Sequence, residues 1–103
     1  MRLHFDEVKS TLSQVLMAHG CAQEQADEVA YEMARNSLEG IYTHGINRFA
    51  RLVRNIDEGI VKPGMMPVRI GGFGAIEIYE GGRGLGSTNA RLCMARAMEW
   101  AGV

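Results

Sequence analysis

Apolar residues recur at helical spacing through the first 60 residues and predict three amphipathic helices. The first helix places its apolar side chains within an arc of about 100°, at Phe5, Val8, Leu12, Val15 and Leu16. Gly20 follows this stripe and is placed to end the helix, because glycine adopts the left-handed conformation at a helix C-terminus at little cost. Asp6 and Glu7 suit the positive end of the helix dipole.

The second and third helices follow from the same periodicity. The second begins near Gln23 and ends at Gly40, and its predicted buried side consists of Ala26, Val29, Ala30 and Met33. The third runs from about His44 to Glu58, and its apolar side consists of Phe49, Leu52, Val53 and Ile56. Gly59 is placed to end this third helix.

The pattern changes after residue 60, where glycines and short apolar runs replace the helical periodicity. Proline and glycine in Val61-Lys62-Pro63-Gly64 predict a turn. Val68-Arg69-Ile70 and Ala75-Ile76-Glu77-Ile78-Tyr79 predict two short strands around the glycine-rich stretch 71–74. Seven of the 13 glycines lie between Gly71 and Gly86, so turns are expected to dominate this middle segment.

A fourth helix is predicted to open at Ser87 or Thr88, because both residue types are good N-caps. Its predicted buried side consists of Ala90, Cys93, Met94, Ala97 and Ala101. The whole pattern therefore predicts a mixed α/β fold that is mainly helical. It has three amphipathic helices, a two-strand glycine-rich segment and a further helix.

Composition and charge narrow the class of protein. The 103 residues are 47% hydrophobic and 22% charged, which is typical of a globular chain, and their length predicts one domain, 1–103. A net charge of −1 gives no general electrostatic reason to bind nucleic acid or an acidic membrane. No apolar run approaches the roughly 20 residues of a membrane span, and early charged residues argue against a secretory leader. The two cysteines lack metal-ligand spacing and disulfide density, so no metal site is predicted and a cytoplasmic location is expected.

The connection between the second and third helices holds the main candidate for chemistry, since polar residues on such loops often serve function. With Thr43 as an N-cap, His44 and Arg48 would share one side of the third helix at its N-terminus. Free N–H groups attract anions there. Arg48 could hold a carboxylate while His44 offers a proton to a neighbouring oxygen. Gly45 would leave space for a ligand beside the imidazole.

Other interpretations of these residues stay open at this point. His44 and Arg48 could be solvated surface residues, and Thr43 could be a helix cap alone. Arg48, Arg51 and Arg54 form a basic side that could contact DNA, although the acidic second helix offsets its charge.

The glycine-rich segment 82–87 matches a nucleotide-binding loop only in part. The dinucleotide fingerprint needs a glycine at its sixth position, where this chain has Ser87. The helix that follows is not succeeded by a strand, so the βαβ context is missing. A turn followed by a helix cap explains the segment, and no cofactor-binding residue is predicted in this chain.

The segment Tyr42-Thr43-His44-Gly45-Ile46-Asn47-Arg48-Phe49 resembles the N-terminal part of the malate/L-lactate dehydrogenase-type family of NAD(P)-dependent oxidoreductases, which is distinct from the Rossmann-fold lactate dehydrogenases. The hallmark of that family is a Ser-His-Gly triplet, an arginine four residues after the histidine, and a Gly-Ile-x-x-Pro-like step. Here these positions hold Thr43-His44-Gly45, Arg48 and Gly59-Ile60-Val61-Lys62-Pro63. The continuation through Phe49 is most similar to the 2,3-diketo-L-gulonate reductase branch of the family.

The resemblance implies a role for three residues. His44 would donate a proton to the keto oxygen of a 2-oxo acid as hydride reaches the adjoining carbon. Arg48 would bind the substrate carboxylate. Thr43 would replace the family serine and keep its hydroxyl contact, with an added methyl group that narrows the pocket.

The resemblance also implies what lies outside the chain. Family members are much longer, and the segments that bind NAD(H) or NADP(H) lie beyond the position of Val103. Residues 1–103 are therefore expected to form the N-terminal substrate-side region of a larger α/β oxidoreductase, homodimeric when complete, and to be inactive alone. The alternative from another class is a small helical binding or interaction module without catalysis.

Overall fold

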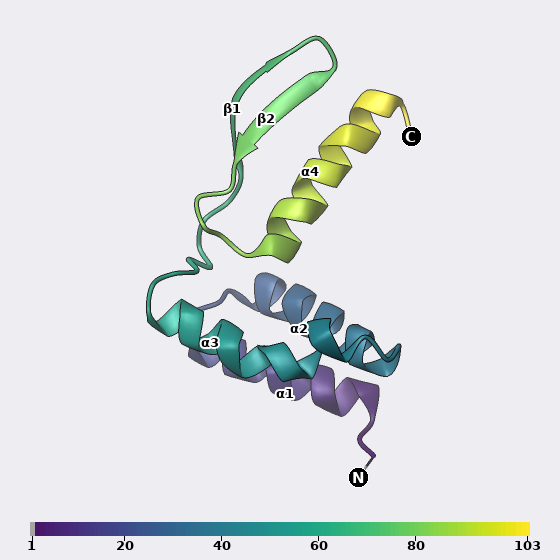
Figure 1. Ribbon diagram of the computed structural model, residues 1–103, viewed down its shortest axis with the longest axis vertical. Coiled ribbons are helices and arrows are strands. Elements are labelled where there is room, and N and C mark those ends of the chain that lie inside the picture. Colours follow the sequence, from purple (N-terminus) through teal and green to yellow (C-terminus); the bar gives the residue numbers. More distant parts are fainter. Residues whose placement is uncertain (1) are drawn as a thin grey trace.

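The computed structural model describes residues 2–103 and has two parts, a unit of three helices and a β-hairpin with a fourth helix beside it (Figure 1). The helices are α1 (Phe5–Ala18), α2 (Gln23–Leu38), α3 (Phe49–Asp57) and α4 (Gly86–Ala101), and the strands are β1 (Val68–Phe73) and β2 (Ile76–Glu80). Two short 3₁₀ turns, η1 (Tyr42–His44) and η2 (Ile46–Arg48), connect α2 to α3. The predicted fold class, mixed and mainly helical, is confirmed.

The apolar stripes predicted for the first two helices face the contact between α1 and α2, where about half of their residues are buried and Phe5, Val8, Val15 and Met33 are half-buried. The buried apolar residues of these helices are Leu12, Leu16, Ala26, Val29, Ala30 and Ala34. Ile56 of α3 and Leu85 just before α4 join the same core cluster. Gly20 (φ +98°) and Gly40 (φ +83°) end α1 and α2 as predicted, in the left-handed region that favours glycine.

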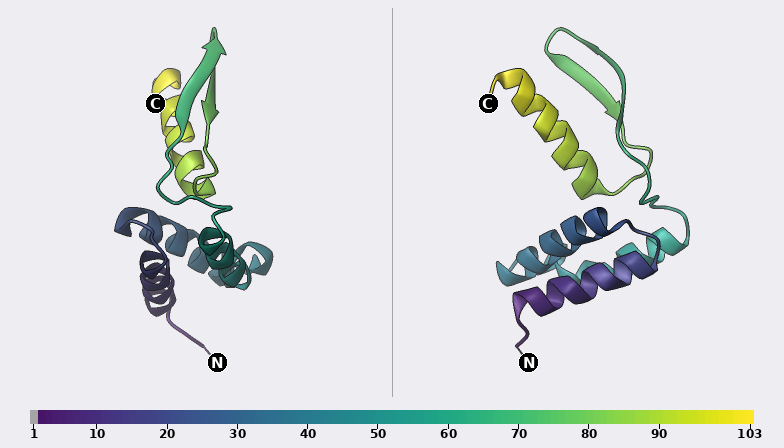
Figure 2. Two further views of the ribbon diagram at one scale, coloured as in Figure 1. Left: turned by 90° about the vertical axis from the view of Figure 1, so that its left-hand side faces the viewer. Right: turned by 180° about the vertical axis from the view of Figure 1, so that it is seen from behind.

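A polar contact also fixes α3 against α1. His19 is the C-cap residue of α1, and its Nδ1 lies 2.7 Å from Oδ1 of Asp57 at the end of α3. Between α1 and α2, the Ser13 hydroxyl donates to the Asp27 carboxylate. The three helices therefore share polar as well as apolar contacts and lie side by side in every view (Figure 2).

The hairpin extends away from the helical unit, with α4 running beside it (Figures 1 and 2). β1 and β2 are antiparallel, and Phe73 pairs with Ile76 across the turn. Both predicted strands are confirmed, with β1 longer than expected because it continues through the glycines to Phe73. Every residue of β1 is exposed, whereas Glu77 and Tyr79 of β2 are half-buried because they line the groove against α4.

The third helix begins at Phe49, not near His44 as predicted. The physical reason is the backbone of Gly45, whose ψ of −147° leaves the helical region and divides the segment into η1 and η2. The end of α3 is as predicted, since Gly59 follows with a φ of +75°.

Two predictions for the fourth helix are wrong. α4 begins at Gly86, with Leu85 at the N-cap position and no capping hydrogen bond from a side chain, so neither Ser87 nor Thr88 caps it. The predicted buried side is mostly open: Ala90, Met94, Ala97 and Ala101 are exposed and Cys93 is half-buried. Cys93, Ala97 and Ala101 line a groove with the hairpin and Ala90 lines one with α2, and neither element covers this side of the helix.

The molecule is elongated, with extents of 52 × 31 × 23 Å, because the hairpin and α4 extend from the helical unit rather than fold across it. Among the helices of residues 2–103, none combines the length and the apolar character that crossing a membrane requires.

Candidate functional site

The connection from α2 to α3 forms tight turns because its backbone hydrogen bonds close three residues apart. The His44 N–H donates to the Ile41 carbonyl at 3.1 Å, and the Arg48 N–H donates to the Gly45 carbonyl at 3.0 Å. His44 therefore ends one 3₁₀ turn and Arg48 ends the next.

The Thr43 side chain contacts the imidazole of His44. The Thr43 hydroxyl oxygen lies 3.0 Å from His44 Nδ1, and both residues are exposed. The prediction that Thr43 caps the third helix is wrong, because α3 begins at Phe49 with Arg48 at its N-cap position and no capping hydrogen bond from that side chain. The contact occupies one ring nitrogen of His44, so Nε2 is the nitrogen free to meet a ligand.

Arg48 occupies the N-cap position of α3 and is exposed. In the part of the chain that the structure describes, Arg48 forms no ion pair, so its guanidinium is available to an anion. The prediction that His44 and Arg48 share one side of a continuous helix is wrong, because Gly45 separates their two turns. The structure instead places all three candidate residues on one short exposed connection.

Gly45 has a different role from the predicted one. It is buried rather than open, and it lies against Ser37 of α2. A Cβ at position 45 would overlap the Ser37 hydroxyl and lie 3.0 Å from the Ser37 backbone nitrogen. Glycine is therefore required for the connection to approach α2 closely, not to make room for a ligand.

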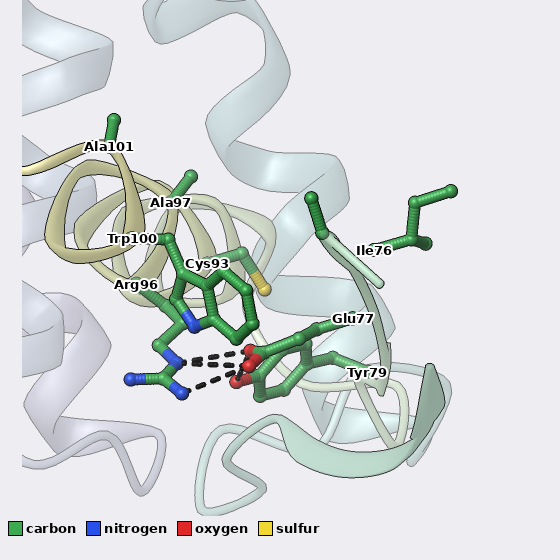
Figure 3. A pocket seen from close by; sticks show the side chains of 9 residues that line it. Ile76, Glu77, Tyr79, Cys93, Arg96, Ala97, Trp100 and Ala101 are labelled. Atoms are coloured by element: carbon green, nitrogen blue, oxygen red, sulfur yellow. Dashed lines mark hydrogen bonds and ion pairs between the residues drawn. The ribbon is translucent and has the colours of Figure 1, made fainter. Parts of the chain in front are cut away.

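A second group of polar side chains lies in a groove between the hairpin and α4 (Figure 3). The groove has a volume of about 670 Å³ and is lined by residues of both elements, among them Ile76, Ala97 and Trp100. Arg96 of α4 meets Glu77 of β2 through contacts of 2.9, 3.0 and 3.3 Å. The Arg96 guanidinium also lies over the Trp100 ring, 5.5 Å from its centroid.

The charges of this cluster stabilise one another. Hydrogen bonds from Arg96, and then from the Tyr79 hydroxyl at 2.7 Å, lower the pKa of Glu77 from 4.5 to about 2. The bond to Glu77 raises the pKa of Tyr79. Sequence reasoning missed this cluster because Glu77 and Arg96 are 19 residues apart. The alternation of side chains along a strand does predict that Glu77 and Tyr79 lie on the same face, which is the part of the cluster that the sequence indicates.

The glycine-rich segment before α4 is a turn, as predicted. Arg83 adopts a positive φ of 61°, and a Cβ on Gly84 would lie 2.5 Å from the Met65 carbonyl oxygen. Gly84 thus lets the turn lie close to the backbone of Met65, where a side chain would not fit. Among the residues that the structure describes, no three His, Cys, Asp or Glu side chains could hold a metal ion together.

Comparison with known proteins decides the family. The profile of the malate/L-lactate dehydrogenase family matches residues 3–102. The chain belongs to this family. Among malate/L-lactate dehydrogenase family members, the 2,3-diketo-L-gulonate reductases of Citrobacter koseri and Klebsiella pneumoniae are 40% and 41% identical to it over 101 residues. This agrees with the branch indicated by the sequence around Arg48.

Solved structures of the malate/L-lactate dehydrogenase type share the fold. The malate dehydrogenase of Entamoeba histolytica aligns over 96% of this chain with a TM-score of 0.86 and 29% identity. The malate dehydrogenase of Pyrococcus horikoshii aligns over the same share with a TM-score of 0.84 and 28% identity. The chain spans 28% of the length of both structures and 30% of the two reductases.

Proposed function

We propose that this chain is the substrate-side N-terminal region of an NAD(P)-dependent oxidoreductase that reduces a 2-oxo acid to a 2-hydroxy acid. The observation that carries the proposal is the 3.0 Å contact between the Thr43 hydroxyl and His44 Nδ1, on an exposed connection that also carries Arg48. Family membership supports an oxidoreductase, and the names of the relatives support a keto acid as substrate.

His44 is the proposed proton donor. When a ketone is reduced, the carbonyl carbon accepts hydride and the carbonyl oxygen must gain a proton. In the imidazolium form of His44, Nδ1–H donates to the Thr43 hydroxyl, and Nε2–H is left to donate to the substrate oxygen. Thr43 is thus proposed to orient the ring that supplies the proton.

Arg48 is the proposed anchor of the substrate carboxylate. Guanidinium and carboxylate match as two parallel N–H···O bonds, which fix the orientation of a planar acid as well as its position. A carboxylate held there would also favour the charged form of a nearby imidazole, so binding of substrate would prepare His44 to donate. The threonine methyl group at position 43 narrows the space around this anion.

The hydride source is proposed to be NADH or NADPH, bound mainly by sequence outside this chain. The segment that most resembles a nucleotide loop has Ser87 where the dinucleotide fingerprint needs a glycine, so we assign no cofactor contact to it. The proposed substrate class, by analogy with the named reductases, is a 2-oxo acid like 2,3-diketo-L-gulonate. A homodimeric assembly and a cytoplasmic location complete the proposal.

The experiment that tests the proposal uses the complete protein encoded by the reading frame that contains this chain. Oxidation of NADH and NADPH is followed with 2,3-diketo-L-gulonate and with simpler 2-oxo acids. His44→Ala is expected to lower kcat by about 10²–10⁴-fold, the usual contribution of a general acid. Binding of the reduced cofactor, measured by its fluorescence, is expected to remain unchanged.

A matched control is His4→Ala, since His4 is also exposed but lies at the N-cap position of α1 without a capping hydrogen bond. This variant is expected to retain wild-type rates. Full activity of His44→Ala would remove His44 from the mechanism. The absence of turnover with every 2-oxo acid would favour the interpretation as a binding module.

A further inference from the structure

Two neighbouring side chains at the end of α2 hold the backbone on either side of Gly45. The Asn36 side-chain amide donates to the His44 carbonyl at 3.1 Å. The Ser37 hydroxyl accepts the Ile46 N–H at 2.9 Å. Two consecutive residues of α2 therefore form hydrogen bonds to the two peptide groups that flank Gly45. One of these groups contains the His44 carbonyl.

Close packing at Gly45 also holds the connection against α2. Gly45 is buried against Ser37, with no room for a side chain between the connection and α2. The backbone carbonyl of Asn36 also accepts the Ile41 N–H at 2.8 Å, where the chain leaves the helix. The connection is thus fixed to α2 at its start and again beside His44.

Asn36 and Ser37 belong to a well-packed helix. α2 packs against α1, and its residues Val29, Ala30 and Ala34, on the turns before Asn36, are buried. By contrast, the Thr43 and His44 side chains are exposed and contact each other. The position of the His44 backbone is therefore set from α2 rather than by packing of its own side chain.

We propose that Asn36 and Ser37 are positioning residues for His44, an inference that rests on the proposed function of His44 as proton donor. They act on the backbone, Asn36 by fixing the His44 carbonyl and Ser37 by fixing the next peptide N–H. A proton donor must lie within hydrogen-bond distance of the substrate oxygen, and a displacement of about 1 Å can lower the rate by up to 10²-fold. Arg48 lies beyond both contacts, at the start of α3.

The first test is independent of catalysis and uses the complete protein. In Ser37→Ala, the Ile46 amide loses its acceptor, and its hydrogen exchange is expected to speed up by about tenfold or more. Ser10→Ala is the matched control, because Ser10 is an exposed serine on α1. Unchanged exchange at Ile46 in Ser37→Ala would show that the contact does not hold the connection, and would overturn the proposal.

The second test uses the complete protein and separates kcat from KM. Asn36→Ala and Asn36→Asp both remove the amide donor and are expected to lower kcat by about 10- to 100-fold, with KM for the 2-oxo acid within about threefold of wild type. Ser37→Thr keeps the hydroxyl acceptor and is expected to recover most of the rate that Ser37→Ala loses.

The outcomes distinguish this proposal from the proposed function. Wild-type kcat in Asn36→Ala and Ser37→Ala, together with an inactive His44→Ala, would overturn the positioning role and leave the proposed function standing. An active His44→Ala would overturn the proposed function itself. A loss of kcat that follows a loss of melting temperature equally in all variants, Ser37→Thr included, would also overturn the positioning role.

Discussion

Arg96 of α4 and Glu77 of β2 form a two-pronged ion pair, with Nη2 2.9 Å from Oε1 and Nε 3.0 Å from Oε2. The pair joins the hairpin to α4, and the Glu77 side chain retains only 8% of its exposed area there. An apolar groove surrounds it (Figure 3). A charged contact thus holds together two elements that share little buried apolar surface.

The free energy of unfolding of the hairpin and α4 is therefore expected to fall at acidic pH. The folded state lowers the pKa of Glu77 from 4.5 to about 2, so the contribution of Glu77 to the free energy of unfolding is complete above pH 4.5. It is lost as the pH falls toward about 2. Glu77→Gln is expected to be less stable than wild type at neutral pH, and the difference is expected to vanish near pH 2.

Urea unfolding followed by the fluorescence of Trp100, the single tryptophan, measures this difference where it occurs. Glu58→Gln is the control, since Glu58 is an exposed carboxylate at the C-cap of α3. A Glu77→Gln difference that stays constant across the acid range would contradict the assignment.

Replacing Gly45 by alanine is expected to destabilise the chain by about 1–3 kcal/mol, the usual cost of inserting a methyl group into a filled space. The new Cβ would overlap the Ser37 hydroxyl, whereas the φ of −100° at Gly45 is open to alanine. Gly64→Ala is the control, because a Cβ there meets nothing within 4 Å. Chemical denaturation measures both, and the control is expected to lie within about 0.5 kcal/mol of wild type. Equal stability of the two variants would show that the approach to α2 is not tight.

Replacing Arg48 by lysine is expected to raise KM for the 2-oxo acid by about tenfold or more in the complete protein, because lysine cannot form the paired hydrogen bonds of guanidinium. The effect on kcat is expected to be smaller. Arg51→Lys, on an exposed position of α3, serves as the control in the same steady-state assay. An unchanged KM in Arg48→Lys would argue against the carboxylate role.

The isolated 103-residue chain is expected not to oxidise NADH in the presence of 2,3-diketo-L-gulonate. The reason is that the proposal assigns the cofactor to sequence outside this chain, whose glycine-rich turn has Ser87 at the sixth position of the dinucleotide fingerprint. The assay is the one used for the complete protein, run at high concentration of the chain. Clear turnover would place a cofactor site within these residues.

The apolar faces of helices could be predicted from the sequence wherever local periodicity determines the structure. The α1 and α2 stripes and the glycines that end both helices follow from periodicity and from the conformational freedom of glycine. The start of α3 could not be predicted in this way. It depends on Gly45 lying against Ser37, a contact between α2 and the connection that follows it, which local pattern does not show.

The sequence predicted that the three candidate residues share one connection, but it did not predict their arrangement, and their roles stay predictions. Thr43, His44 and Arg48 do lie together on one exposed connection. Their relation to one another differs from the prediction, because Thr43 contacts the imidazole instead of capping a helix. The side of α4 that faces the groove was predicted as core because its residues are small and apolar, but burial depends on which elements cover it.

The three-helix unit and the hairpin differ in their contacts with the connection that carries His44. Leu85 is buried in the cluster of the three helices, whereas β1 is exposed along its whole length. Substitutions in the exposed strand β1 are therefore expected to leave the turn that carries His44 unchanged, whereas substitutions at Asn36 and Ser37 of α2 are expected to alter it directly. Among homologues, divergence should accumulate in the hairpin and be restrained at Asn36, Ser37 and Gly45. A change of substrate could then arise from residues elsewhere while the placement of the histidine is inherited intact.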